Sequence, residues 1–239
     1  MKKTTSKSQI KRPIYMGILN ITPDSFSDGG KFNDIKKAVK QAKKLEREGA
    51  DIIDIGGEST GPNSKKISAE EEIKRIIPIL KELKKKIKIP ISIDTYKYEV
   101  AKKALEEGAD IINDVTALRG SKKMGKLIAE HKCPIILMYS KDKTARTTIK
   151  EKKYKDVTSD IKKFLEKRIN YAKKQGISDK NIIIDPGMGH FISKIPKYSF
   201  EIIAKLEKLK KLKHPILIGI SRKSFMGESM KTRLNKQKF

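Results

Sequence analysis

The sequence contains one cysteine, Cys133, among 239 residues. A single thiol cannot form an intramolecular disulfide, so the packed core must hold the fold together. Cys133 precedes an apolar stretch, which favours a buried structural thiol. No apolar run approaches membrane-spanning length, and the basic start leads into a run too short for a signal peptide. We therefore expect a protein of the reducing cytoplasm that has no membrane partner.

Acidic residues are also scarce: 29 face 56 basic residues, giving a formal net charge of +27. Such an excess can indicate nucleic-acid binding. Only eight of the basic residues are arginines, however, and the lysines lie mostly on the polar faces of predicted helices, interleaved with glutamates. This distribution favours a solvated lysine-rich surface that attracts small anions over a specific nucleic-acid partner, although a basic nucleic-acid-binding protein remains the alternative.

The strand-to-loop junctions carry no GxGxxG or Walker motif, which disfavours a doubly wound open sheet, the alternative fold. Seven apolar segments predict strands, at 14–19, 50–57, 90–94, 109–115, 134–139, 181–189 and 215–224. Six helices are predicted between them, at about 34–48, 68–86, 98–107, 122–131, 156–175 and 199–212. The alternation predicts an α/β fold, a TIM-type (β/α)8 barrel that lacks its last strand and helix.

Local signals refine this assignment. Asp34 is predicted to cap the first helix, and Ser68 with Glu71 predicts a capping box for the second. The long polar segment 140–153 is a candidate mobile loop. We divide the chain into a basic N-terminal segment (1–13), a barrel domain (14–227) and a basic C-terminal tail (228–239). This tail is too polar for a buried eighth strand, so we expect a truncated product or completion by another polypeptide.

Polar residues recur where the predicted strands end, and barrel active sites are built at that face. The residues at these ends, all polar except Met138, are Asn20, Asp54, Asp94 with Thr95, Asn113 with Asp114, Met138, Asp185, and Ser221 with Arg222 and Lys223. Converging Asp and Asn side chains suit a flat heterocycle with amino and ring N–H groups. The adjacent Arg and Lys suit an anion, and the oxygen of Asn20 suits Mg²⁺ shared with a phosphate.

Six sequence words extend the interpretation: MGILNITPDSFSDGG, GADIIDIGGEST, ISIDT, GADIINDV, IIIDPGMG and GISRKSF. Together, from Ile14 to about Gly227, they resemble the dihydropteroate synthases of folate biosynthesis. This family joins p-aminobenzoate to a dihydropterin methyl diphosphate with the help of Mg²⁺. The sister methyltetrahydrofolate methyltransferases share the barrel and some strand-end residues, but TPDSFSDGG and SRKSF look like the synthase.

The resemblance assigns roles to individual residues. Pterin binding would fall to Asp94, Asn113, Asp185 and Lys223, with Asp54 nearby. Asn20 would take part in the Mg²⁺ and diphosphate site, Thr60 would contact substrate, Ser221 would lie near the aminobenzoate, and Arg222 would bind substrate. Asp28 would steady the cationic pterin, so the resemblance makes Asp28, Asp185 and Lys223 the catalytic candidates. It also implies a possible homodimer.

Three departures from the family pattern qualify the implied activity. Gly61 precedes Pro62 where the family has an Arg after GEST, which removes an anion contact. His190 and Phe191 replace a Phe-Gly pair in a wall of the aminobenzoate pocket. Nothing after Lys223 matches the family's Arg-x-His motif. A non-catalytic or weakly active pterin-binding protein, or a methyltransferase-like barrel, is therefore the alternative function.

Overall fold

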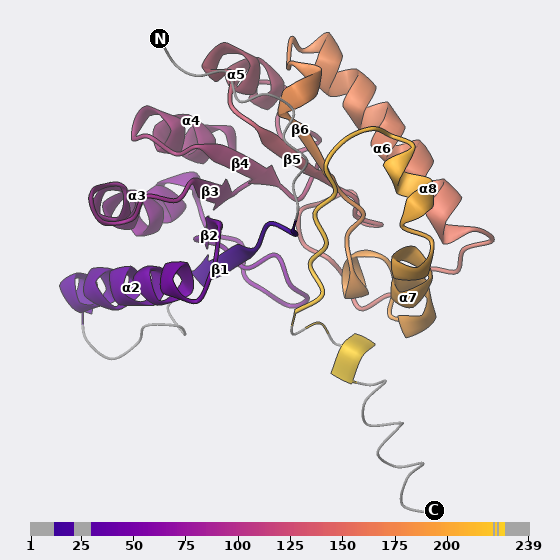
Figure 1. The fold of residues 1–239 in the computed structure, drawn as a ribbon, viewed down its shortest axis with the longest axis horizontal. Coiled ribbons are helices and arrows are strands. Elements are labelled where there is room, and N and C mark those ends of the chain that lie inside the picture. The colour runs from indigo at the N-terminus through magenta and orange to yellow at the C-terminus, as the bar shows by residue number, and fades with distance from the viewer. Residues whose placement is uncertain (1–11, 22–29, 222, 224, 228–239) are drawn as a thin grey trace, which may run out of the picture.

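The computed structural model describes residues 12–21, 30–221, 223 and 225–227 (Figure 1). One parallel sheet has the strand order β1-β2-β3-β4-β5-β6. The strands are β1 (Met16–Asn20), β2 (Ile52–Gly56), β3 (Ile91–Asp94), β4 (Ile111–Asp114), β5 (Ile135–Met138) and β6 (Ile182–Asp185). The helices are α2 (Gly30–Arg47), α3 (Ala69–Lys86), α4 (Tyr98–Glu106), α5 (Met124–His131), α6 (Val157–Lys174), α7 (Pro196–Ala204) and α8 (Glu207–Lys210), with short 3-10 turns η1 (Asp179–Asn181) and η2 (Gly189–Phe191).

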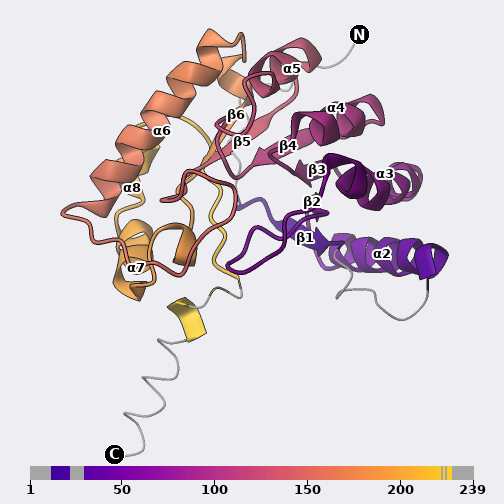
Figure 2. The same cartoon turned by 180° about the vertical axis from the view of Figure 1, so that it is seen from behind.

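Helices cover the outer side of this sheet (Figures 1 and 2). Alternate strand residues such as Ile53, Ile55 and Ile93 are fully buried there. Helix α3 contributes Ile76 and Leu80, also fully buried, to the same core. Burying each such side chain stabilises the fold by about 1.5–3 kcal/mol, so the sheet-to-helix layer supplies a large share of the stability.

The predicted capping signal holds at one of two positions. The Ser68 side chain accepts a hydrogen bond from the Glu71 N–H at 3.0 Å, and α3 follows. Asp156 likewise caps α6 through the Ser159 N–H. The prediction for Asp34 is wrong, because α2 begins at Gly30 and places Asp34 inside the helix. A helix begins where backbone hydrogen bonds begin, and a residue of capping type does not fix that point.

The last predicted strand is much reduced. Segment 215–217 meets β6 at one parallel bridge, Ile184 to Ile216, flanked by two backbone hydrogen bonds of 3.0 and 2.8 Å. Beyond it, Ile220 is 43 % exposed. The predicted helix 199–212 is likewise divided into α7 and α8. Because the structure describes no strand on the far side of 215–220, half of that backbone has no ladder partner, which weakens a regular strand.

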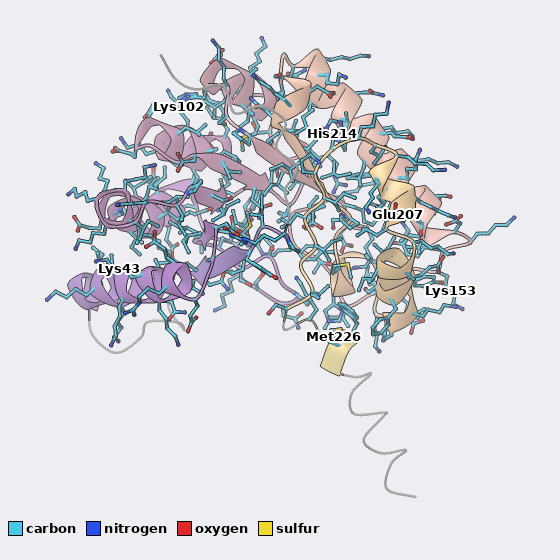
Figure 3. All side chains as sticks on the ribbon, in the orientation of Figure 1. Lys43, Lys102, Lys153, Glu207, His214 and Met226 are labelled. Carbon is cyan, nitrogen blue, oxygen red and sulfur yellow. The ribbon has the colours of Figure 1, made fainter. Side chains whose placement is uncertain are left out.

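The sheet is open, as in a partial barrel. On β1, which lies at one edge, Ile18 is 53 % exposed. Three lysine side chains illustrate the solvated surface: Lys43 on α2 and Lys102 on α4 are exposed on the outer layer, and Lys153 is exposed in the loop before α6 (Figure 3). Within the described ranges, no helix combines the length and apolar character that crossing a membrane requires.

Two substitutions test this open arrangement. We expect Ile53→Ala to lower the free energy of unfolding by about 2–5 kcal/mol, because Ile53 is 0 % exposed and leaves a cavity. Ile18→Ala should cost about 1 kcal/mol or less, since half of the side chain already contacts water. Urea unfolding monitored by circular dichroism measures both values. Equal losses would show that the inner side of β1 is covered in solution.

Candidate active site at the carboxyl ends of the strands

The carboxyl ends of four neighbouring strands form one row of residues. Asn20 is in register with Gly56, Gly56 with Asp94, and Asp94 with Asn113. Residues in register on parallel strands point to the same face of a sheet, which here is the inner face opposite the helices. Only Gly56 lacks a side chain, and a Cβ there would approach Asn20 Oδ1 to 3.3 Å. The row therefore places three polar side chains around a small central residue.

One step below this row, Asp54 on β2 meets Asn113 on β4. Asn113 Nδ2 donates a hydrogen bond to Asp54 Oδ2 at 3.1 Å, across the intervening strand β3. Both side chains are buried. Among the described residues, neither Asp54 Oδ1 nor Asn113 Oδ1 has a hydrogen-bond partner. Two buried acceptor oxygens without donors are costly unless a ligand or water supplies N–H or O–H groups.

The carboxylates at these strand ends have perturbed acidities. Burial raises the pKa of Asp54, against the stabilising effect of the nearby Ser92 hydroxyl and of the hydrogen bond from Asn113. The pKa of Asp94 lies well above its ordinary value, first because of burial and then because of repulsion from Asp54. Burial raises the pKa of Asp185 to about 6. A set of desolvated like charges of this kind is typical of a binding site for a hydrogen-bond donor.

Lys223 and the turn after β6 complete this side of the site. The positive charge of Lys223 opposes the rise in pKa at both Asp94 and Asp185, so its ammonium lies close enough to act on both. Lys223 Nζ also lies 5.3 Å from the centre of the Phe191 ring. Asp185 Oδ1 accepts from the Gly187 N–H at 2.7 Å. Gly187 has φ 67°, and a Cβ there would stand 2.4 Å from the Tyr139 carbonyl, so glycine is required.

The remaining predicted residues differ in their placement. Thr60 is half-buried in the loop after β2, and its carbonyl accepts from the Thr147 N–H at 3.1 Å. Ser221 is exposed. Asp28 and Arg222 lie outside the described residues. The structure thus brings Asp54, Asp94, Asn113, Asp185 and Lys223 together at one edge of the sheet, with Asn20 beside Asp94 in the first row.

Sequence reasoning missed a buried ionic cluster beside this site. Lys97 forms ion pairs with Glu58 and Glu72, and Arg146 forms one with Glu58. Glu58 follows β2 closely in GGEST, so the strand-end criterion could have found it. Lys97 and Arg146 lie in connecting segments and follow no local pattern, and their pairing depends on long-range folding. Burial raises the pKa of Glu72 despite the neighbouring Lys97.

The strand-end residues also determine whether the site could hold a metal ion. Within the part of the chain that the structure describes, no three His, Cys, Asp or Glu side chains group closely enough to hold a metal ion. Asn20 offers an exposed amide oxygen at the end of β1. A magnesium ion keeps several waters and takes one or two protein ligands when phosphate oxygens supply the rest, so a single oxygen ligand is compatible with it.

Comparisons with known proteins identify the class. The pterin binding enzyme family model matches residues 16–238, so the chain belongs to the pterin-binding enzyme family. A dihydropteroate synthase of Clostridium beijerinckii is 48 % identical over 217 residues, covering 91 % of this chain and 77 % of that protein. A Xanthomonas albilineans dihydropteroate synthase with 4-aminobenzoic acid superposes with a TM-score of 0.84 at 39 % identity, covering 92 % and 77 % of the two chains. The same enzyme in complex with 7,8-dihydropteroate gives 0.81 at 37 % identity, covering 93 % and 78 %. These relatives are dihydropteroate synthases with a barrel fold.

Asp185 should link stability to pH. Its pKa is 3.8 ordinarily and about 6 in the fold, so the folded state binds the proton more tightly than the unfolded state does. Stability from this group is complete below pH 3.8 and is lost as pH rises through about 6, a penalty of about 3 kcal/mol for the ionised form. Asp185→Asn should remove that penalty. We expect the variant to gain free energy of unfolding over wild type at pH 8, and this gain to vanish near pH 4. A gain that does not depend on pH would contradict the assignment.

Proposed function

We propose that this chain is a transferase that condenses (7,8-dihydropterin-6-yl)methyl diphosphate with p-aminobenzoate, giving dihydropteroate and diphosphate. The observation that carries the proposal is the pair of unpartnered buried oxygens on Asp54 and Asn113, beside the raised pKa values of Asp94 and Asp185. A pterin edge bears amino and ring N–H groups, which are the donors that these oxygens lack. Family membership and the dihydropteroate synthase relatives support the same substrate.

The proposed roles of the residues follow the family pattern. Asp54, Asp94, Asn113 and Asp185 accept hydrogen bonds from the pterin ring. A donor-rich ligand supplies hydrogen bonds that offset the desolvation of the carboxylates, so pterin binding should lower their pKa values toward the ordinary range. Lys223 donates to the pterin and balances Asp185. Thr60 and Ser221 contact the aminobenzoate side, and Arg222 binds substrate.

The chemistry needs stabilisation of two opposite charges. The bond between the pterin methylene and the diphosphate oxygen breaks, and diphosphate leaves with the electron pair. The amine nitrogen then forms the new C–N bond and loses a proton. Asp28 and Asp185 stabilise the cationic pterin through their carboxylates. Bound Mg²⁺, held by the Asn20 oxygen and diphosphate oxygens, would offset the negative charge of the departing group.

Further predictions accompany this proposal. We propose a cytoplasmic enzyme, because a single cysteine and the folate-type substrates suit that compartment. We also propose a homodimer, by analogy with the family. That the chain has no specific nucleic-acid partner stays a prediction. The division of the chain into segments 1–13, 14–227 and 228–239 also stays a prediction.

Incubation with the dihydropterin diphosphate, p-aminobenzoate and Mg²⁺ tests the function. We expect diphosphate release that depends on both the amine and Mg²⁺, with dihydropteroate as the product by chromatography. Asn20→Ala should raise the Mg²⁺ concentration needed for half-maximal rate. Tight pterin binding without release would support the alternative of a non-catalytic pterin-binding protein. Methyl transfer from a methylated folate would instead support the methyltransferase-like alternative.

Two substitutions separate binding from chemistry. Asp185→Asn should weaken pterin binding about tenfold or more, because the amide replaces a charged acceptor at a buried ligand contact. Asp28→Ala should lower kcat with little change in pterin affinity, since the charge that it opposes develops only toward the cation. Calorimetric titration with a pterin and steady-state kinetics measure the two effects. Equal losses of pterin affinity in both variants would remove the basis for this division.

A further inference from the structure

The loop after β5, residues 140–153, contacts two other loops at the mouth of the site. One residue, Thr147, makes both connections and is 3 % exposed. Its N–H donates to the Thr60 carbonyl at 3.1 Å, in the loop after β2. Its hydroxyl Oγ1 donates to the His190 carbonyl at 2.8 Å, in the turn after β6. The β5 loop was expected to be mobile, and these contacts do not favour that expectation.

Arg146 strengthens the connection to the β2 loop. Its Nε donates to the Ser64 carbonyl at 2.9 Å, and Nη2 donates to the Lys65 carbonyl at 2.9 Å. The same guanidinium forms an ion pair with Glu58, whose side chain is 3 % exposed. One side chain therefore fixes three points of the segment 57–66, which contains Thr60. A flexible lysine ammonium is a point charge and lacks the planar fork that reaches several acceptors at once.

Lys141 holds the other end of the bridge. Its side chain is 4 % exposed, and Nζ donates to the carbonyls of His190 and Thr148, each at 2.6 Å. The Lys141 N–H also donates to the Phe191 carbonyl at 2.8 Å. Ala145 packs against Phe191 in a small buried apolar cluster with Val115 and Met138. The β5 loop thus joins the β2 loop and the β6 turn by hydrogen bonds and by apolar packing.

The segment 57–66 has little regular structure of its own to hold Thr60. It contains no helix or strand, and within it the Ser64 N–H donates a backbone hydrogen bond to the Gly61 carbonyl at 3.3 Å. The pterin-facing residues are different, because Asp54, Asp94 and Asn113 belong to strands whose ladders fix them. Loss of the β5 bridge should therefore move the position of Thr60 and leave the strand-end carboxylates in place.

We propose that Arg146 and Thr147 are positioning residues that hold Thr60 at a fixed distance from the β6 turn and so set the geometry of the p-aminobenzoate pocket. The inference rests on the proposed function, because that function places the amine substrate beside Thr60. Neither residue touches the reacting atoms. Their effect passes through Thr60 and through the backbone at His190 and Phe191.

A charge-balanced variant isolates the bridge. Arg146→Met alone leaves Glu58 in a buried cluster with one cation fewer, which can impair folding. Glu58→Gln with Arg146→Met removes one charge of each sign and leaves the Lys97–Glu72 pair intact. Thr147→Val is a nearly isosteric second variant that removes the hydroxyl bond to His190. Lys143→Met is the matched control, because Lys143 is an exposed cation of the same loop.

Hydrogen–deuterium exchange tests the positioning without any turnover. We expect faster exchange in a peptide covering 57–66 in the double variant, and wild-type exchange in Lys143→Met. Peptides covering β2 and β3 should be unchanged. Wild-type exchange of 57–66 in the folded double variant would overturn the inference, whether or not the protein is an enzyme.

Kinetics then test the consequence for the substrate. We expect the double variant to raise the KM for p-aminobenzoate about tenfold or more, and Thr147→Val to raise it less, with pterin affinity near wild type in both. Combining Thr60→Ala with the double variant should raise this KM no further than Thr60→Ala alone, because the two changes act through one residue. Equal losses of pterin and amine affinity would indicate a merely structural role and contradict the proposal. If the wild-type protein showed no turnover, that result would count against the proposed function. The exchange result would still decide whether Arg146 and Thr147 hold Thr60 in place.

Discussion

The desolvation of acidic side chains at the strand ends is the constraint on which the site depends. Asp54, Asp94 and Asp185 project from the inner faces of strands, where Asp54 and Asp185 are buried and Asp94 is half-buried. Burial is accordingly the main cause of the raised pKa at each of the three. Such an arrangement destabilises the fold when the groups are ionised. A ligand that brings donors into the site turns that cost into binding energy, which explains why a stable core tolerates the carboxylates.

The core and the site use opposite faces of the same strands. Ile53 and Ile55 pack outward under the helices, while Asp54 between them points inward. Because successive side chains of a strand point to opposite faces, the residues that stabilise the core and the residues that form the site alternate along β2. In the described part of the chain, no helix covers inner-face residues such as Ile18. They are shielded from water only by the curvature of the sheet. An open sheet consequently has its site and its incompletely covered apolar residues on the same inner face.

Much of this could be predicted from the sequence, for identifiable reasons. Apolar runs marked six strands correctly, five of them with an Asn or Asp at or near the end and β5 with Met138 there. The register confirms that Asn20, Asp94 and Asn113 share one row. The predicted cap is present at Ser68 and absent at Asp34, because a residue of capping type is not sufficient to start a helix. The last strand was overestimated: the apolar run after Pro215 has strand composition, yet one neighbour supplies only a single bridge. Asp28 and Arg222 lie outside the described residues, so their roles rest on sequence alone.

The connections between loops could not be predicted, because they join residues with no shared local pattern. Arg146 lies 88 residues beyond its carboxylate partner Glu58, and nothing in the intervening sequence indicates the pair. This pairing also bears on the Gly61 departure, which removes a cation from the β2 loop. Arg146 brings a guanidinium to the same loop, but its Nε and Nη2 are directed at backbone carbonyls and at Glu58. Arg146 therefore helps to hold the β2 loop in place, but it does not supply the anion contact that the family's Arg would provide. Attraction of the substrate's negative groups must then come from the other cations at the strand ends, among which Lys223 is already placed beside Asp185.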